Sequence, residues 1–388
     1  MLRYLTSGES HGKALVAIVE GFPAGFEISE EYINKQLKKR QGGHGRGGRM
    51  AIETDKVQII AGVRDGKSMG SPITLMIENK DWENWQNIMQ AAKGAHIEER
   101  KVTKPRPGHA DLTGTIKYNH KDVRNVLERA SARETAIRVA VGALAECILQ
   151  HFEIDVFGHV VKIATVDAKV NYENLNEELY NTPLYCTDEV ATGEMIKIID
   201  EAKNNGDSLG GIVEVVAKNV PKGLGSYVHW DRKLDARLAY AVMSIQAIKA
   251  VELGAGFNSA NLSGSELHDE IYFSGEKGFY HETNNSGGIE GGMSNGEPII
   301  LRAAMKPIPT LYKPLKSVDY FTKEQYEASV ERSDSCAVSA AAIVAQSVVS
   351  LEIANSFLEK FAGDNLQEIE GNYENYVNYL AEINEVSR

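Results

Sequence analysis

The fold class is indicated most clearly by residues 131–152, which read SARETAIRVAVGALAECILQHF. Ser131 and Glu134 have the S-x-x-E spacing of a capping box, which predicts the start of a helix at this point. Most of the side chains that follow are Ala, Val, Ile or Leu, and they cover almost every side of the expected helix. Because a helix that is apolar all round is usually buried, we expect residues 131–152 to form a core helix.

Strands and helices are expected on both sides of this core helix. β-Branched and apolar runs predict strands at residues 15–20, 57–63, 73–77, 156–166, 211–220 and 298–303. Helical patterns predict helices at residues 29–39 with Ser29 as N-cap, 189–204, 233–251 and about 335–361. These elements do not alternate in the strict βαβ rhythm of a doubly wound fold. The sequence therefore predicts the α+β class, as a layered sandwich.

Composition and charge restrict the function classes. The 388 residues include 42 Lys+Arg and 54 Asp+Glu, so the formal net charge is 42 − 54 = −12. The hydrophobic fraction of 43% is ordinary for a globular protein and argues against a disordered chain. An acidic chain is a poor candidate for general nucleic-acid binding. Three widely spaced cysteines predict a reducing cytoplasm and no zinc site.

We expect one domain over residues 1–388. The chain has no Ser/Pro-rich linker, charge block or short repeat that would divide it. A helical C-terminal tail from about residue 341 carries no motif. We expect neither a signal peptide nor a membrane span, because no basic stretch precedes an apolar one at the start and no uninterrupted apolar run approaches about 20 residues. The 35 glycines cluster in a few places, which is typical of tight turns and of close backbone approach to a ligand.

Two histidines lie in short turns beside small residues. His11 belongs to Gly8-Glu-Ser-His-Gly12, and His109 belongs to Arg106-Pro-Gly-His-Ala-Asp111. A single histidine of this kind is more often an incidental residue of a surface turn. Two of them suit proton transfer near neutral pH, whereas their spacing does not suit a metal site.

A basic, glycine-rich segment stands out in this acidic chain. Residues 32–52 contain no Asp or Glu, and their centre reads Gly42-GHGRGG-Arg49. Arginines and bare backbone amides at this density could surround an anionic ligand. A solvated basic loop is the alternative, and an RGG-like single-strand binder is disfavoured because the segment is short and has no aromatic residue near its centre.

Four further blocks could contribute to an anion site. Arg129-ASARE-Thr135 places two arginines at the expected start of the core helix, where free backbone amides favour the binding of phosphate. A capped helix whose arginines are solvated is about as good an interpretation of this block. Gly291-GMSN-Gly296 is a second amide-rich loop, and Lys306-PIP-Thr310 is held extended by its prolines. In Arg332-SD-Ser335, Asp334 could serve a site or merely cap the long helix.

Together these blocks resemble the chorismate synthase family. The family's motifs occur in order between residues 8 and 338, as GESHG, GHGRGGR, RPGHAD, RASARET, Gln246-Ala247, GGMSNG, KPIPT and ERSDSCAV. The resemblance implies a β-α-β-α sandwich and a homotetramer. It also implies conversion of 5-enolpyruvylshikimate 3-phosphate to chorismate by 1,4-anti elimination of phosphate, with reduced FMN required although the reaction has no net redox change.

The resemblance also implies roles for individual residues. His11, His109 and Asp334 would be catalytic: His11 would protonate the leaving phosphate, His109 would manage the proton on the reduced flavin, and Asp334 would serve the flavin N5 region. The substrate's anionic groups would be bound by Ser10, Arg40, Arg46, Arg49, Arg106 and Arg133. FMN would be contacted by Arg129, Ala130, Ser131, Gln246, Ala247, Gly291, Lys306, Pro307, Ile308, Pro309, Thr310 and Arg332. No metal is implied. Arg40 and Arg46 would also contact NADPH in members that reduce their own flavin; other members depend on a separate flavin reductase.

Two other function classes remain open on the sequence. A flavin- or nucleotide-dependent reductase would carry out net hydride transfer, and a noncatalytic RNA-binding module would use the arginine-glycine loop. Neither accounts for eight ordered blocks.

Overall fold

The computed structural model describes residues 1–47, 54–313, 315–328 and 334–384. Two antiparallel sheets form its frame. The smaller has the strand order β1 (Arg3–Ser7), β2 (Ala14–Glu20), β6 (Ile73–Glu78) and β3 (Val57–Ala61). The larger has the order β10 (Ile248–Leu253), β15 (Ile299–Met305), β9 (Gly211–Lys218), β7 (Asp155–Ile163) and β8 (Val166–Asp167). Hairpins are formed by β4 (Val63–Arg64) with β5 (Lys67–Ser68), β11 (Ile271–Ser274) with β12 (Gly278–His281), β13 (Ile289–Glu290) with β14 (Met293–Ser294), and β16 (Lys316–Val318) with β17 (Gln325–Glu327).

Helices fill the space between the two sheets and extend beyond their ends. The longer ones are α1 (Glu30–Gln41), α6 (Thr135–His151), α7 (Glu189–Asn204), α8 (Leu234–Met243), α10 (Val338–Lys360) and α11 (Leu366–Asn384). The shorter ones are α3 (Gln86–Met89), α4 (Asp111–Tyr118), α5 (Arg124–Ala130) and α9 (Gly264–Leu267). The chain is therefore α+β, as expected.

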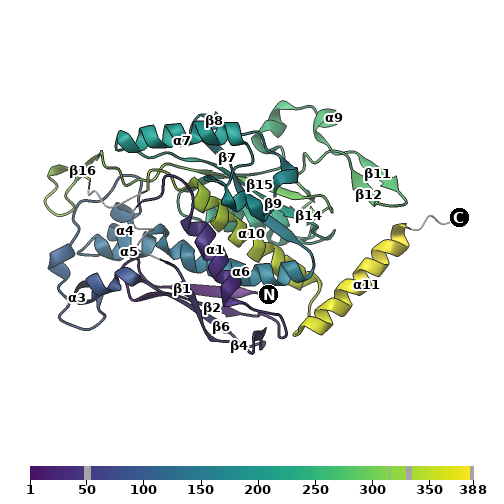
Figure 1. Cartoon of the computed structure of the whole chain (residues 1–388), viewed down its shortest axis with the longest axis horizontal. Helices are drawn as coiled ribbons and strands as arrows, with labels where there is room; N and C mark the ends of the chain where they lie inside the picture. The colour runs from purple at the N-terminus through teal and green to yellow at the C-terminus, as the bar shows by residue number, and fades with distance from the viewer. Residues whose placement is uncertain (48–53, 314, 329–333, 385–388) are drawn as a thin grey trace.

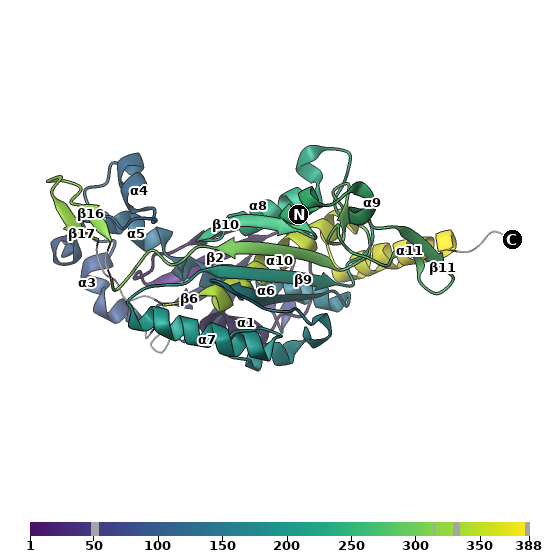
Figure 2. The same ribbon diagram turned by 90° about the horizontal axis from the view of Figure 1, so that it is seen from above.

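The layers are a sheet, a group of helices and a second sheet (Figure 1). Helix α6 packs on β2 and β6 of the smaller sheet, and α10 packs on β7 and β9 of the larger sheet. The two helices also pack on each other, with α1 beside both. Seen from above, α7 flanks the larger sheet on its β8 side (Figure 2). The expected core helix is confirmed, because α6 is buried along almost its whole length.

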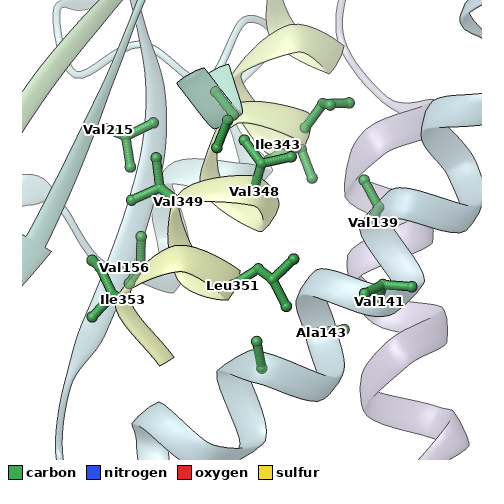
Figure 3. Packing of buried hydrophobic residues seen from close by; sticks show 14 of the residues in the cluster. Val139, Val141, Ala143, Val156, Val215, Ile343, Val348, Val349, Leu351 and Ile353 are labelled. Atoms are coloured by element: carbon green, nitrogen blue, oxygen red, sulfur yellow. The ribbon is translucent and has the colours of Figure 1, made fainter. Parts of the chain in front are cut away.

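One hydrophobic cluster runs through these layers. Figure 3 shows its centre, where Val139 and Ala143 of α6 lie opposite Ile343 and Leu351 of α10. Val215 of β9 lies on the other side of α10. Helix α10 is long and apolar enough to cross a membrane by length and composition, but 94% of its apolar window is buried inside the protein. Its hydrophobicity is accounted for by this position between α6 and the larger sheet.

The contact between α6 and α10 depends on a glycine. A Cβ atom added to Gly142 would lie 2.4 Å from Cβ and 2.6 Å from Cα of Ser347 in α10. The two helix backbones therefore approach more closely than any side chain at position 142 allows.

We expect Gly142→Ala to lower the free energy of unfolding by about 1–3 kcal/mol, because overpacking a tight core contact forces backbone shifts. The matched control is Gly371→Ala in α11, where an added Cβ meets no atom within 4 Å. That change should be neutral or stabilising by up to about 1 kcal/mol. Denaturant unfolding of both variants measures the difference, and equal stabilities would show that the α6–α10 contact is not tight.

Three expected elements differ from the structure. The predicted helix at 233–251 ends at Met243, and the residues from Ile248 onward form strand β10. Ala247 has φ +69°, a left-handed conformation that breaks the helix. Pairing of β10 with β15 then outweighs local helix propensity. The strand predicted at 57–63 is interrupted at Gly62, and the one predicted at 156–166 is interrupted at Ala164; both residues have positive φ.

The predicted capping box is also wrong. The Ser131 side chain accepts a hydrogen bond from the Arg133 amide and caps a 3-10 turn that precedes α6. The Glu134 carboxylate accepts hydrogen bonds from Thr6 Oγ1 and Gln246 Nε2 instead of the N-cap amide. By contrast, the predicted Ser29 cap of α1 and the bounds of α7 are confirmed.

The long helix begins later than expected. Its first residue is Val338 and its N-cap is Ala337, so Asp334 does not cap it. After α10, a further helix, α11, extends away from the sheets beside the β11–β12 hairpin (Figures 1 and 2). The opposite end of the molecule carries α3, α4, α5 and the β16–β17 hairpin (Figure 2). His109 comes just before α4, so part of the predicted site lies at this end.

Candidate active site

His11 lies in the loop between β1 and β2 and is held by Glu128 of α5. Its Nδ1 atom is 2.9 Å and 3.0 Å from the two oxygens of the Glu128 carboxylate. The backbone amide of His11 donates to the same carboxylate at 2.8 Å. The Glu128 side chain is only 1% exposed, whereas the His11 side chain is 14% exposed. The imidazole therefore keeps partial access to solvent while its partner is buried.

Trp85 packs on the His11 ring. The ring centroids are 4.1 Å apart and the planes are inclined by 27°, which is a stacked arrangement. Arg100 and Arg124 lie against the Trp85 ring, at 4.8 Å and 4.9 Å from its centroid. Arg124 also donates to Glu128 at 3.1 Å. The His11 side chain is thus fixed by a carboxylate at one nitrogen and by an indole at one face.

His109 has the same kind of partner. Its Nδ1 atom is 2.5 Å from Oδ1 of Asp111, whose side chain is fully buried. Arg106 donates to both oxygens of that carboxylate through Nε and Nη2, and through Nη1 to Thr310 Oγ1. The Arg106-to-Asp111 motif therefore builds a closed local unit of histidine, carboxylate and arginine.

Both carboxylates are held ionised. Burial raises the pKa of Glu128, but the hydrogen bond and charge of His11 outweigh it, so the pKa lies below its usual value. The pKa of Asp111 is also lowered, because the hydrogen bonds from His109 and Arg106 exceed the effect of burial. Each histidine accordingly faces a negative charge, which orients the ring.

A buried arginine cluster lies at the start of α6. Arg40 donates to Thr135 Oγ1 and to the Ala132 carbonyl, and its Nη1 atom is 3.6 Å from the Asp55 carboxylate. Arg133 donates to the other oxygen of Asp55 at 2.6 Å. Burial lowers the pKa of Arg40 to about 10, with Arg133 and Arg46 adding to the shift. One carboxylate thus holds two guanidinium groups close together.

Arg46 and Asp334 extend this cluster. Arg46 Nη1 lies 2.7 Å from Asp334 Oδ2, and the Gly47 amide donates to Asp334 Oδ1 at 2.6 Å. Asp334 therefore anchors the glycine-rich loop, although the two segments are almost 290 residues apart in sequence. Arg49 and Arg332 lie outside the described residues.

Arg133 links this cluster to the His11 loop. It donates from Nε to Asn79 Oδ1, and the Asn79 side-chain amide donates to the carbonyls of Glu9 and Gly12. Ser10, which is buried, donates its amide to the Glu128 carbonyl. The substrate-binding arginines predicted near the N-terminus and the His11 turn are therefore neighbours.

The residues predicted to contact flavin form a connected path. Arg129 donates to Thr6 and to the Gly8 carbonyl, and Glu134 joins Thr6 to Gln246. Ala247 accepts a hydrogen bond from the Lys306 amide. The path thus runs from the His11 loop to the 306–310 segment, with Ala130 and Ser131 following Arg129 at the end of α5.

The 306–310 segment closes on the His109 turn. The Lys306 ammonium donates to the Gly108 carbonyl, and Thr310 accepts from Arg106. Partial burial and the nearby Lys249 lower the pKa of Lys306. Ile308 accepts from Ser208, which fixes the extended chain between Pro307 and Pro309.

Gly291 lies apart from these residues. It occupies the β13–β14 turn, near the start of α8, whereas Gln246 follows the end of that helix. Ten residues of helix separate the two ends by about 15 Å. Within one chain, Gly291 is therefore not placed beside the other predicted flavin contacts.

Several residues of the cluster were not predicted as site residues from the sequence. They are the acidic or aromatic partners of predicted residues, namely Asp55, Trp85, Asp111, Glu128 and Glu134. Asp111 stands inside a motif and Glu128 directly precedes Arg129, but spacing alone does not show which carboxylate will face a histidine. Among the described residues, no group of three or more His, Cys, Asp or Glu side chains is arranged to hold a metal ion.

Comparisons with known proteins identify the family of this chain. The family model described as chorismate synthase matches residues 2–358. Chorismate synthase of Desulforamulus reducens is 57% identical over 387 residues, covering 99% of this chain and 100% of that protein. Chorismate synthase of Geobacter metallireducens is 58% identical over 390 residues, covering 98% and 99% respectively.

The fold agrees as well. A crystal structure of a chorismate synthase superposes with a TM-score of 0.80 at 42% identity and covers 98% of both chains. The match extends over both sheets and the helices between them. On these grounds the chain belongs to the chorismate synthase family, whose members are carbon–oxygen lyases.

Proposed function

We propose that this protein converts 5-enolpyruvylshikimate 3-phosphate to chorismate by 1,4-anti elimination of phosphate, with reduced FMN required and no net redox change. The proposal rests on two histidines, each hydrogen-bonded to a buried carboxylate, and on a buried arginine cluster in the same protein. Such an elimination must bind a strongly anionic substrate and must move two protons, one to the leaving phosphate and one from the ring.

The arginine cluster suits the substrate's charges. The substrate carries two carboxylates and a phosphate of about −1.5 to −2. Among the described residues, Arg40, Arg46 and Arg133 face two carboxylates, Asp55 and Asp334, so these five side chains together carry one excess positive charge. Arg40 Nη1 is buried and has no hydrogen-bond partner among the described residues. A buried guanidinium hydrogen that is not satisfied by the protein is available to an anion.

His11 is proposed as the acid that protonates the leaving phosphate. Its Nδ1 is occupied by Glu128, so a proton would leave from Nε2. His109 is proposed to hold the proton on the reduced flavin, and Asp334 is proposed to serve the flavin N5 region. In these roles the protein supplies binding, orientation and proton transfer.

Two features of the predicted flavin contacts support the binding of FMN. Gln246 Oε1 is buried and accepts no hydrogen bond among the described residues, so it needs a donor such as a ring N–H. Lys306 with nearby Lys249 offers positive charge for a phosphate. When bound, reduced FMN supplies electron density that assists departure of the phosphate and a site that receives the ring proton. A reductase assay with NADPH alone distinguishes a protein that reduces its own flavin from one that relies on a separate reductase.

We further propose that the protein acts in the shikimate pathway, in the cytoplasm, as a homotetramer without nucleic-acid or membrane partners. Three free cysteines support a reducing compartment. The tetramer rests on family resemblance and is tested by light scattering coupled to size-exclusion chromatography.

Replacing Arg46 by Ala is expected to raise KM by about 10- to 100-fold, because a charge-assisted hydrogen bond contributes about 1.5–3 kcal/mol. The value of kcat should change much less. Steady-state kinetics with saturating reduced FMN measure both constants. The control is Arg64→Ala, which removes an exposed arginine of the β4–β5 hairpin. An unchanged KM in the Arg46 variant would contradict its role in binding substrate.

A further inference from the structure

The Glu128 carboxylate contacts His11 in three ways. It lies within 3.0 Å of ring Nδ1 through both oxygens and accepts the His11 backbone amide at 2.8 Å. The Glu128 carbonyl accepts the amide of Ser10 at 3.0 Å. Backbone and side chain of the catalytic turn are therefore both fixed by one residue of α5.

The surroundings of the imidazole determine which of its nitrogens can reach a ligand. Trp85 covers one face at a centroid distance of 4.1 Å. Ring Nε2 has no hydrogen-bond partner among the described residues, and 14% of the side chain is exposed. Of the two ring nitrogens, only Nε2 is available to a ligand.

The charged groups around the ring come from three segments. Glu128 and Arg124 belong to α5, and Arg100 ends the 3-10 turn Ile97–Arg100. Glu9 lies in the same loop as His11. Glu128 contacts the imidazole directly. The two arginines lie against the Trp85 ring, and Arg124 also binds Glu128.

We propose that Glu128 is a positioning residue for His11, which fixes the proton on Nδ1 and makes Nε2 the atom that gives up the mobile proton. A carboxylate at Nδ1 sets both the tautomer and the orientation of a catalytic imidazole. Burial would make Glu128 harder to ionise, but the contacts to His11 keep its pKa low, so the negative charge is retained.

This inference rests on the proposed role of His11 as proton donor, and it predicts a property that can be observed without turnover. In the wild-type protein, 15N NMR of labelled histidine should show neutral His11 protonated at Nδ1. The His11 signals are assigned among the ten histidines by their loss in His11→Ala. Protonation at Nε2 instead would overturn the proposal with no Glu128 variant needed.

The variant test is Glu128→Gln, followed by 15N NMR of His11. An amide can present either its oxygen or its NH2 group to Nδ1, so the preference for a proton on Nδ1 should be weakened, and kcat should fall. Glu128→Asp keeps a carboxylate and should restore part of both effects. The matched control is Glu370→Gln, which removes a carboxylate 2.8 Å from the more exposed His151 and should leave His11 unchanged.

The outcomes separate the two proposals. An unchanged His11 tautomer in a folded Glu128→Gln protein would overturn the role of Glu128, whatever the turnover. Normal kcat in His11→Ala would overturn the proton-donor role of His11, while the tautomer change in Glu128→Gln could still be present.

Discussion

His11→Ala should lower kcat by about 10²–10⁴-fold, the range in which general acid–base groups contribute, while KM stays within a few-fold of wild type. The reason is geometric. His11 is the imidazole held between Glu128 and Trp85 with Nε2 available, whereas the arginines carry the charges that bind substrate. His109→Ala should likewise lower kcat with little change in KM, because the Asp111 carboxylate contacts its Nδ1 atom as Glu128 contacts that of His11.

The measurement is steady-state kinetics without oxygen, at saturating substrate and reduced FMN. His96→Ala is the control, since His96 is an exposed histidine paired with Glu99 at the surface. Near-normal kcat in the His11 variant would refute its role as the acid for the leaving phosphate. A large rise in KM with unchanged kcat would assign His11 to binding.

Asp334→Asn should lower kcat by about 100-fold or more. The alternative role of Asp334 as a helix cap is excluded, because α10 begins at Val338 and Asp334 does not cap it. The asparagine oxygen can still accept the Gly47 amide, but the charge that faces Arg46 is lost. We expect the free energy of unfolding to fall by no more than about 1–3 kcal/mol, the contribution of a hydrogen bond to a charged group.

Kinetics distinguish two roles for this carboxylate. If Asp334 takes part in proton transfer, kcat falls at saturating substrate. If it only holds Arg46, the variant should resemble Arg46→Ala, with a raised KM and a normal kcat. The control is Asp200→Asn, which removes an exposed carboxylate that binds His44 in the same glycine-rich loop. Denaturant unfolding verifies that each variant is folded.

The sequence predicted best those features that depend on local pattern. The core helix was expected because apolar residues surround it, the N-cap of α1 follows from Ser29, and the bounds of α7 follow from amphipathic spacing. Strand β10 was missed because Ile248–Leu253 continues a helical pattern. Only its pairing with β15, which joins residues about 50 positions apart, makes it a strand.

In the site, too, local patterns were predicted and long-range contacts were not. Motifs drew attention to the histidines and arginines, since these residue types are unusual in glycine-rich turns. The pairings of His11 with Glu128 and of Arg46 with Asp334 could not be identified, because these contacts span 117 and about 290 residues. Glu134 illustrates the error that follows: its spacing from Ser131 suggested a local cap, but its carboxylate bridges Thr6 and Gln246.

The proposed elimination needs reduced flavin without consuming it. The most direct test is to incubate the protein without oxygen with 5-enolpyruvylshikimate 3-phosphate and a small amount of photoreduced FMN, and to measure chorismate formed per flavin. We predict many chorismate molecules per flavin, with the flavin still reduced at the end, and none with oxidised FMN. One product per reduced flavin, or oxidation of the flavin in step with product, would contradict the account and indicate an ordinary reductase.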